Sequence, residues 1–377
     1  MMRKAFKYRL YPTKKQAELL DETLWLCREV YNAAIQERRD AYKKTGVSVG
    51  YYEQKRSLVE AKRLVPELKD VHSQVLQDVV RRVDLAFQAF FRRVQNGEKA
   101  GYPRFRGRHR YDSFTYPQAG EAGAEPLQEA AKAYLPKVGN VRCKYHRPLE
   151  GIVKTATIRR EGEHWYITFS CVVEPQPLPV TGRVMAFDLG TNPNLLIPHE
   201  GEPVRAPRHW KRSAKKVARL QKARARKRRG SRRSKELKRQ IRCEHQRAAN
   251  RRRDFHHKLA RRIVNEHDVI IHENLRPKNM ARGYGAASIH DAGWGQFINI
   301  LSFKAEEAGR RVVPVDPAFT SQDCSSCGHR QKVPIGRPYE CEACSVTLDR
   351  DVNAARNILA RGLDGAIGET MLVAAGP

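Results

Sequence analysis

The sequence predicts a multidomain α+β protein in which a small β-barrel carries a helical insertion and a following α/β domain carries a short metal-binding insertion. Three observations support this fold class. A mostly helical stretch, residues 11–106, precedes a β-rich one, residues 107–180, and short apolar runs then alternate with helical stretches as far as residue 364. Two C-x2-C pairs interrupt this last region. Because single hydrophobic cores stop growing near about 250–300 residues, a chain of 377 residues can hold several domains.

The chain opens with a strand pattern, since the apolar residues Phe6, Tyr8 and Leu10 alternate with basic ones. This strand has no partner nearby in the sequence. We therefore expect residues 1–10 to join the sheet predicted at residues 107–180, so that the two segments together form one β-barrel. A Glu-Gly-Glu turn between two apolar runs of the later segment indicates a β-hairpin there.

The helical insertion, residues 11–106, ends in a run that interleaves basic and aromatic side chains, Gly101-Tyr102-Pro103-Arg104-Phe105-Arg106. Arg104 and Arg106 are candidates for contacts with nucleic-acid phosphates. Phe105 could stack on a base, or it could simply pack on the helices. The sequence leaves both roles open for Phe105.

The chain is strongly basic, with 72 Lys and Arg against 41 Asp and Glu and a net charge of +31. A polyanion is the natural partner for that charge, which makes nucleic acid the leading candidate. The charge is not confined to one amphipathic helix, and no apolar run approaches the roughly 20 residues that span a bilayer. We therefore expect a cytoplasmic, DNA-associated protein with no membrane partner and no small-molecule substrate.

Part of this charge lies in residues 208–239, which contain 17 Lys or Arg and a single acid, Glu236. One interpretation is a solvated or partly disordered basic arm. The other is a long helical hairpin beside a nucleic-acid duplex, where the basic side chains neutralise phosphates and release counterions. A Gly-Ser break at residues 230–231 would divide the two helices of such a hairpin.

Two C-x2-C pairs predict a metal site. Cys324 and Cys327 are separated from Cys341 and Cys344 by thirteen residues. Each pair can place two thiolates on one tight turn, and two such turns complete a tetrahedral four-sulfur site for one Zn²⁺ ion. Because the protein supplies all four ligands, the ion should be structural. Ser345 occupies the place after the second pair that a glycine occupies after the first.

Three carboxylates predict a second metal site. Asp188 and Glu273 each follow a short buried-strand run, and neighbouring strands would align them. A helix that begins near residue 350 carries Asp349 and Asp351, of which Asp351 shares its face with the apolar residues that should pack inward. We therefore assign Asp351 as the third acid. Taken singly, each acid could instead cap a turn, pair with a basic residue or complement a helix N-terminus.

Three clustered carboxylates repel one another unless cations join them, and Mg²⁺ prefers carboxylate and water oxygens. Two Mg²⁺ ions about 3.5–4 Å apart can activate a water molecule and stabilise the leaving oxygen of an in-line displacement. Together the three acids predict metal-dependent phosphodiester hydrolysis.

These residues resemble the TnpB (OrfB) family of insertion-sequence proteins, relatives of the compact type V CRISPR effectors, over nearly the whole chain. The motifs that carry the resemblance are Arg9-Leu10-Tyr11-Pro12, Gly101 to Arg106, Phe187-Asp188-Leu189-Gly190, Glu273-Asn274-Leu275, Asp316-Pro317 through Thr320-Ser321-Gln322, the two cysteine pairs, and Asp349-Arg350-Asp351-Val352-Asn353-Ala354-Ala355.

The resemblance implies a wedge β-barrel with a helical recognition insertion, then a RuvC (RNase H-like) nuclease domain with a zinc-bearing, target-nucleic-acid-binding insertion. The corresponding segments are residues 1–10 plus 107–180 for the barrel, 11–106 for the recognition insertion, 181–322 plus 347–364 for the nuclease domain, 323–346 for the zinc insertion and 365–377 for a tail.

The resemblance also implies an RNA-guided DNA endonuclease encoded by a transposable element, with a guide RNA from the element's own end. It would cut double-stranded target DNA beside a short adjacent motif at one site, Asp188, Glu273 and Asp351. Tyr52, Gln77 and Thr115 match the segments that would read the adjacent motif. Side chains there would contact base edges of the motif, and the guide RNA would recognise the rest of the target by base pairing.

Two other functions remain compatible with the sequence. One is a guide-dependent DNA-binding protein that cuts weakly or not at all, and the other is a transposase that joins strands with the same metal chemistry. The chain departs from the family pattern at Pro193, which falls in the expected second core strand. Because proline removes a ladder donor, that strand should begin later or bulge.

Overall fold

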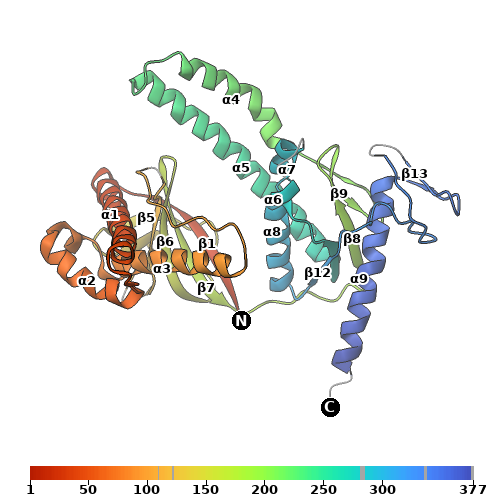
Figure 1. Ribbon diagram of the computed structural model, residues 1–377, viewed down its shortest axis with the longest axis horizontal. Coiled ribbons are helices and arrows are strands. Elements are labelled where there is room, and N and C mark those ends of the chain that lie inside the picture. The colour runs from red at the N-terminus through yellow and green to blue at the C-terminus, as the bar shows by residue number, and fades with distance from the viewer. Residues whose placement is uncertain (109, 121–122, 281–284, 335–337, 375–377) are drawn as a thin grey trace. The chain divides into compact units, whose positions relative to one another are not determined.

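The computed structural model describes residues 1–108, 110–120, 123–280, 285–334 and 338–374 (Figure 1). The chain divides into two compact units, Met1–Glu174 and Pro175–Pro377. Each unit has its own sheet. No described helix is both long enough and apolar enough to cross a membrane.

The first unit contains a seven-stranded antiparallel sheet with the strand order β2-β6-β7-β1-β5-β4-β3. The first strand lies between β7 and β5, so it joins the later sheet as predicted. The short strands β2 and β3 end the order, and the described ladders form a half-barrel, which agrees in part with the β-barrel that we expected. The strands are β1 (Met2–Tyr11), β2 (Ser113–Tyr116), β3 (Glu125–Leu127), β4 (Lys132–Leu135), β5 (Gly139–Lys144), β6 (Ile152–Glu161) and β7 (His164–Val173).

The helices between β1 and β2 form the predicted insertion: α1 (Lys14–Thr45), α2 (Tyr51–Leu64), the 3-10 turn η1 (Pro66–Asp70) and α3 (Ser73–Gln95). Thr13 begins α1 with a capping box, in which Gln16 N–H donates to the Thr13 hydroxyl and Thr13 N–H donates to the Gln16 side chain. Arg82 of α3 donates to the Ser113 carbonyl (2.7 Å) and to the Thr115 hydroxyl (2.7 Å), which fixes this helix to β2.

The second unit is built on a five-stranded sheet with the order β10-β9-β8-β11-β12. Strands β8, β11 and β12 are parallel, whereas β9 is antiparallel to β8 and β10 is antiparallel to β9. The strands are β8 (Val184–Leu189), β9 (Asn194–Pro198), β10 (Val204–Arg205), β11 (Val269–Glu273) and β12 (Arg311–Val315). Strand β9 begins directly after Pro193, as the missing N–H predicted, and Pro193 O accepts a bond from Ala206 N–H.

Helices cover both faces of this sheet. On one face, Phe187 and Ile270 pack into a core with residues of α5 and α8, such as Leu259 and Phe297. On the other, Ala186 and Ile271 pack against Ile358 of α9. The helices are α4 (His209–Ala225), α5 (Arg232–Glu266), α6 (Pro277–Met280), α7 (Ala286–Ala292), α8 (Trp294–Glu307) and α9 (Arg350–Ala374). Since α9 continues to Ala374, the expected tail from residue 365 is helical over its described part, and residues 375–377 lie outside the described chain.

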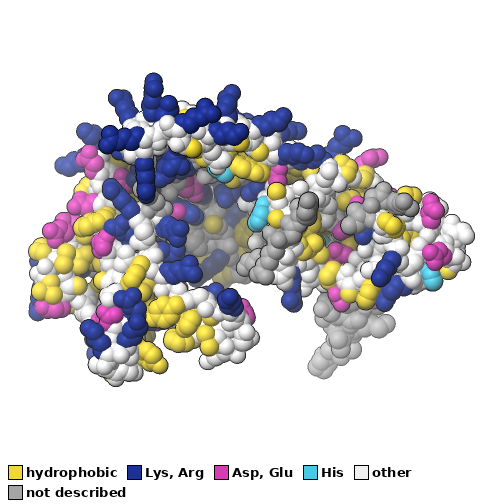
Figure 2. Space-filling model, turned by 45° about the horizontal axis from the view of Figure 1, so that its top comes forward, with side chains coloured by type: hydrophobic (Ala, Val, Ile, Leu, Met, Phe, Trp, Pro, Cys, Tyr) yellow, Lys and Arg dark blue, Asp and Glu magenta, His cyan; other side chains and the backbone are white. Residues whose placement is uncertain are grey.

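The basic segment at residues 208–239 is helical rather than a disordered arm. Helices α4 and α5 pack side by side as a hairpin, with the break between them at Gly230 and Ser231 (Figure 1). Glu244 of α5 joins them, since it accepts bonds from Lys216 of α4 (2.6 Å) and from Arg247 (2.6 Å). Lys and Arg side chains cover the outer surface of this hairpin (Figure 2).

Candidate active site and cysteine cluster

The carboxyl ends of two neighbouring parallel strands place two of the predicted acids beside each other. His272 of β11 pairs in register with Phe187 of β8, so the next residues along the two strands, Glu273 and Asp188, lie at the same edge of the sheet. The third acid, Asp351, lies in the first turn of α9, which packs against β8 and β11. Three elements that are distant in sequence therefore bring the predicted acids to one place.

Asp188 is close enough to Glu273 and Asp351 for their charges to shift its pKa. Burial, followed by the neighbouring charges of Glu273 and Asp351, raises the pKa of Asp188 to about 7. Burial also raises the pKa of Glu273 and of Asp351, and Asp349 adds to the effect on Asp351. Buried acids that repel each other favour either protons or cations, so this set of oxygen donors suits Mg²⁺.

Asp349 and Asp351 have different positions although they are two residues apart. Asp349 Oδ1 accepts bonds from the N–H groups of Asp351 (2.9 Å) and Val352 (3.2 Å), which makes Asp349 the N-cap of α9. The carboxylate of Asp351 instead raises the pKa of Asp188. This arrangement favours Asp351 as the acid of the site and Asp349 as a capping residue.

Glu273 is held by a hydroxyl that sequence reasoning did not single out. Thr320 donates a short hydrogen bond from its hydroxyl to Glu273 Oε1. Thr320 is 3% exposed, and its own carbonyl accepts a bond from the Asn357 side chain of α9 (2.8 Å). Thr320 therefore connects the acid on β11 with the helix that carries Asp351.

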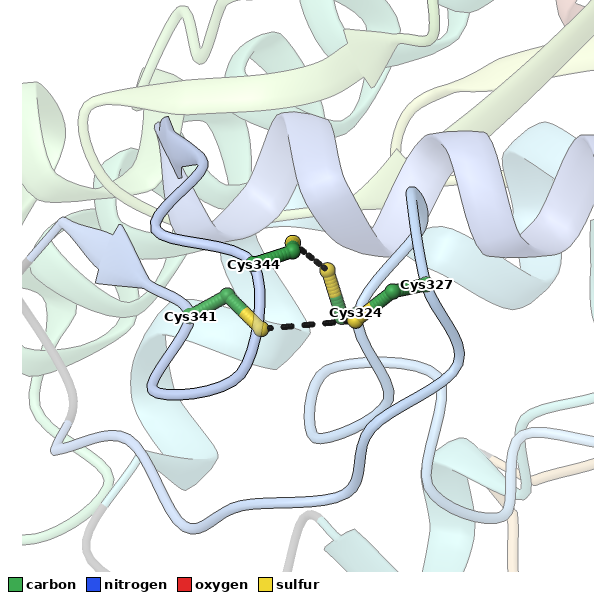
Figure 3. Close-up of side chains that lie close together, drawn as sticks. All are labelled: Cys324, Cys327, Cys341 and Cys344. Atoms are coloured by element: carbon green, nitrogen blue, oxygen red, sulfur yellow. Dashed lines mark hydrogen bonds between the residues drawn. The ribbon is translucent and has the colours of Figure 1, made fainter.

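The four clustered cysteines come together as predicted (Figure 3). All four sulfurs lie within 4.8 Å of one another, with 3.7 Å between Cys324 and Cys344 and 3.6 Å between Cys327 and Cys341. Tetrahedral zinc with sulfurs at about 2.3 Å requires about 3.8 Å between sulfurs, and these two separations are close to that value, so the four cysteines could hold Zn²⁺. Backbone N–H groups of Cys344 and Ala343 outweigh the effect of burial and lower the pKa of Cys341, whereas hydrogen bonds from the neighbouring cysteines raise the pKa of Cys327.

The two cysteine turns have the same backbone geometry. Gly328 N–H donates to the Cys324 carbonyl (2.9 Å), and Ser345 N–H donates to the Cys341 carbonyl (2.9 Å). Gly328 has φ +77° and Ser345 has φ +55°, so the serine adopts the left-handed conformation that the glycine adopts without cost.

Helix α9 is also tied to the cysteine cluster. Asn353, which is fully buried, accepts a bond from Ser325 N–H (2.9 Å) and donates to the Asp323 carbonyl (2.8 Å). Asn357 donates to the same carbonyl (2.6 Å). The first cysteine turn therefore rests on two side chains of the helix whose first turn carries Asp351.

The predicted adjacent-motif residues lie on three elements of the first unit. Tyr52 of α2 is 72% exposed, Gln77 lies on α3, and Thr115 lies on β2. The Thr115 hydroxyl accepts a bond from Arg82 and lies 2.9 Å from the Thr157 hydroxyl. The Thr115 hydroxyl therefore already has hydrogen-bond partners within the protein, which leaves fewer positions for contacts with a base.

In the basic-aromatic run, Arg106 exchanges backbone bonds with the Asn32 side chain, and its guanidinium lies 5.7 Å from the Tyr31 ring centroid. Arg104 is exposed. Phe105 is 45% exposed and lies 5.2 Å from the Arg39 guanidinium, so the ring contacts the helical insertion while much of it stays accessible.

Thr320, Asn353 and Asn357 are the residues that sequence reasoning missed. Their signal was present, because Thr320 and Asn353 fall inside two of the motifs that carry the family resemblance. Their contacts join segments 28–47 residues apart, and periodicity within one element does not reveal such pairs.

Comparison with known proteins identifies close relatives over most of the chain. The chain is 33% identical over 372 residues to a putative RNA-guided DNA endonuclease of Streptomyces pristinaespiralis, an alignment that covers 96% of this chain and 90% of that protein. It is 31% identical to the putative RNA-guided DNA endonuclease InsQ of Escherichia coli K12, covering 95% and 92% of the two chains. It is 29% identical to the CRISPR-associated endodeoxyribonuclease Cas12f1 of Sulfoacidibacillus thermotolerans, over 55% of this chain and 52% of that one.

Family models match three segments: a helix-turn-helix domain of OrfB/IS605 proteins at residues 1–46, an OrfB/IS605 probable transposase at 151–283, and a Cas12f1-like TNB domain at 294–358. The first segment here holds one strand and a single 32-residue helix. The solved Cas12f1 complex with sgRNA and target DNA has a similar fold, with a TM-score of 0.59 at 14% identity over 95% of this chain and 98% of that one.

Proposed function

The chain belongs to the TnpB (OrfB) family, and we propose from this membership that it is an RNA-guided DNA endonuclease that cuts target DNA beside a short adjacent motif. The observation that carries the proposal is the meeting of Asp188, Glu273 and Asp351 at one sheet edge, where burial and the charges of the other two acids raise the pKa of Asp188. The partners would be a guide RNA from the end of the element and double-stranded target DNA, which the net charge of +31 suits.

The nuclease domain would be RuvC-like, an RNase H-like fold. Its support is the strand arrangement of the second unit, in which an antiparallel three-stranded meander, β8 to β10, is extended by the parallel strands β11 and β12. Asp188 is the penultimate residue of β8 and Glu273 is the last residue of β11, so both lie at the same edge of the sheet. We propose Asp188, Glu273 and Asp351 as the catalytic acids.

The carboxylates of these three residues would hold two Mg²⁺ ions. When bound, the ions would supply Lewis-acid activation of a water molecule and stabilisation of the leaving 3′ oxygen during in-line displacement. The protein's contribution is geometric. Thr320 donates a hydrogen bond that fixes one oxygen of Glu273, and Asp349 caps the helix turn that carries Asp351. Burial raises the pKa of Asp188, so a bound cation would replace the proton that Asp188 otherwise holds.

The cysteine cluster would hold one structural Zn²⁺ ion, because two of its sulfur separations are close to those of tetrahedral coordination and four protein ligands leave no open position. The segment around it would contact target nucleic acid, as the matched TNB description suggests. The basic hairpin of α4 and α5 is a further candidate surface for phosphates.

The test begins with the protein expressed beside its native flanking DNA and purified with the RNA that it retains. The sequenced guide then specifies a target, which is offered with Mg²⁺ to the wild type, Asp351→Ala and Asp349→Ala. We expect Asp351→Ala to lose cleavage by at least about a thousandfold while it keeps RNA and target binding. Asp349→Ala should retain substantial activity, since the lost cap costs about 1 kcal/mol of helix stability.

The products distinguish the alternatives. Free 5′-phosphate and 3′-hydroxyl ends indicate hydrolysis, whereas strand joining would support the transposase that one matching family model describes. Guide-dependent binding without cut products would support a DNA-binding protein instead. If Asp349→Ala lost cleavage and Asp351→Ala kept it, the assignment of the third acid would be wrong.

A further inference from the structure

A cavity of about 290 Å³ opens beside the loop that follows Asp188. Thr191 and Asn192 of this loop line it, together with Trp210 of α4 and Ser288 of α7. Its remaining walls are mostly apolar, with Ala206, Pro207, Ala214, Ala287 and Ala292 among them. A flat ring with a few polar edge groups, such as a nucleobase, suits a small cavity of this composition.

Trp210 is held in place from two sides. Its backbone N–H donates to Asp291 (2.8 Å), and its ring stacks on the His245 ring of α5 with centroids 4.5 Å apart and an interplanar angle of 21°. Asp291 also lines the cavity, but its second oxygen accepts a bond from Lys211 N–H (3.0 Å), so this carboxylate is used to begin α4. Because the ring is already held in one position in the folded protein, stacking a base on it would cost little further side-chain entropy.

A basic groove of about 780 Å³ continues from the cavity. The two share the lining residues Ala206, Pro207, Arg208 and Lys211. The groove adds Arg205, Arg212 and Lys215 to them. None of the five basic side chains forms an ion pair with any residue that the structure describes. Five unneutralised cations beside an apolar cavity match a nucleotide, which joins a flat base to anionic phosphates.

The cavity lies near the acids along the chain. Thr191 is three residues beyond Asp188, and three residues span at most about 11 Å, the rise of about three stacked nucleotides. We propose that this cavity and groove form a subsite for the DNA strand being cut, with one unstacked base on Trp210 and the neighbouring phosphates on Arg208, Lys211 and Arg212. This inference rests on the proposed function and names a binding site for its substrate strand.

The test is a binding measurement in EDTA, so that it does not depend on cleavage. Fluorescence-labelled (dT)6 and an abasic hexamer of the same charge are titrated against the full-length wild type and Trp210→Ala, at a salt concentration that suppresses binding through phosphates alone. Base stacking should make the wild type prefer (dT)6 by about 5- to 150-fold. Trp210→Ala should lose that preference, and Trp210→Phe should keep most of it.

Trp25→Ala is the matched control, because Trp25 is an exposed tryptophan of the first unit, 50% accessible. It should leave the preference for (dT)6 unchanged. Arg212→Ala should weaken binding of both hexamers equally and reduce the salt dependence by about one phosphate contact. A preference that survives Trp210→Ala, or that Trp25→Ala removes, overturns the proposal.

A second measurement uses the wild type alone, in case Trp210→Ala fails to fold. A hexamer with 5-iodouracil is crosslinked by light and the adduct is mapped by mass spectrometry. We expect the adduct on the peptide that contains Trp210, and adducts confined to other peptides refute the site. An RNA hexamer that reaches Trp210 in preference to DNA refutes the assignment to the cut strand. If DNA stacks on Trp210 but Mg²⁺ produces no cleavage, the nuclease proposal fails and the base site stands.

Discussion

Gly362 allows α9 to approach the central sheet more closely than any side chain would permit. A Cβ atom built on Gly362 would lie 2.6 Å from Ile271 Cδ1 and 2.9 Å from Cγ1, and closer still to Cγ2. Ile271 is fully buried on β11, so its side chain cannot turn towards solvent. Since carbon atoms in contact lie about 3.5–4.0 Å apart, Gly362→Ala must separate the helix from the strand by about 1 Å.

Two effects of this substitution oppose each other. Overpacking costs about 1–3 kcal/mol, while replacing a helical glycine by alanine contributes up to about 1 kcal/mol of helix propensity. Gly295 of α8 is the matched control, since nothing lies within 4 Å of a Cβ built there. The difference in free energy of unfolding between Gly362→Ala and Gly295→Ala should therefore be about 1–3 kcal/mol, measured by denaturant titration of the full chain.

The rate of cleavage should fall as well. Asp351 lies about 16 Å from Gly362 along the same helix, at 1.5 Å per residue, so a shift of α9 moves this acid relative to Asp188. Misplacement by 1 Å can cost about a hundredfold in rate, and because the helix can pivot we expect a loss of at least about tenfold. Zinc content should not change.

Ile271→Ala removes all three clashing atoms and supplies the decisive comparison. Alone it leaves a cavity and destabilises by about 2–5 kcal/mol. In the double variant the methyl group introduced by Gly362→Ala occupies part of that space, so the two effects should be non-additive by about 1–3 kcal/mol, with partial recovery of cleavage. Additive effects, or full activity in Gly362→Ala, would show that the close approach does not position Asp351.

Three further predictions concern single contacts. Thr320→Val should lower the cleavage rate by about 10- to 100-fold and raise the Mg²⁺ concentration needed for half-maximal rate, because a hydrogen bond to a charged group contributes about 1.5–3 kcal/mol. Thr320→Ser keeps the hydroxyl and should restore both the rate and the Mg²⁺ requirement. A loss of activity in the serine variant would exclude the hydroxyl as the cause. Ser345→Gly should strengthen zinc binding about fivefold in a chelator competition, since it removes about 1 kcal/mol of left-handed strain; a weaker affinity would contradict this. Because the folded state raises the pKa of Asp188 to about 7, its ionisation opposes folding, and without metal the contribution of Asp188 to stability should fall as pH rises from about 4 to about 7. Asp188→Asn should flatten that dependence in EDTA melting curves and melt above the wild type at about pH 8, although it abolishes cleavage; equal slopes would count against a perturbed Asp188.

The elements that sequence predicted correctly are those with a strong local pattern. The alternation at Phe6, Tyr8 and Leu10 identified β1, and its lack of a nearby partner correctly led to the later sheet. The spacing of the cysteines correctly predicted that the four sulfurs come together, and Pro193 correctly predicted the late start of β9. In each case a chemical constraint acts within a few residues, which is the range over which periodicity and turn chemistry are informative.

The features that sequence did not predict depend on contacts between distant segments. Whether a barrel closes depends on pairing between its last strands, and in the described residues β2 and β3 end the strand order without pairing with each other. The bond from Thr320 to Glu273 spans 47 residues, and the contact of Gly362 with Ile271 joins a helix to a strand across the insertion. The residues next to each member of such a pair show no distinctive pattern, so the sequence around either one does not predict the contact.

The placement of the cysteine segment between β12 and α9 has a physical rationale. Asp188 and Glu273 lie at the ends of two paired strands of one sheet, so backbone pairing fixes their relative position, but Asp351 lies on a helix that has no backbone pairing with the sheet. That helix is fixed instead by packing at its middle and by Asn353 and Asn357, which bond to the turn of Cys324 and to Thr320 near its start. The order of the cysteine segment therefore contributes to the position of Asp351, and a structural metal there would affect the proposed cleavage through α9 without touching the reacting atoms.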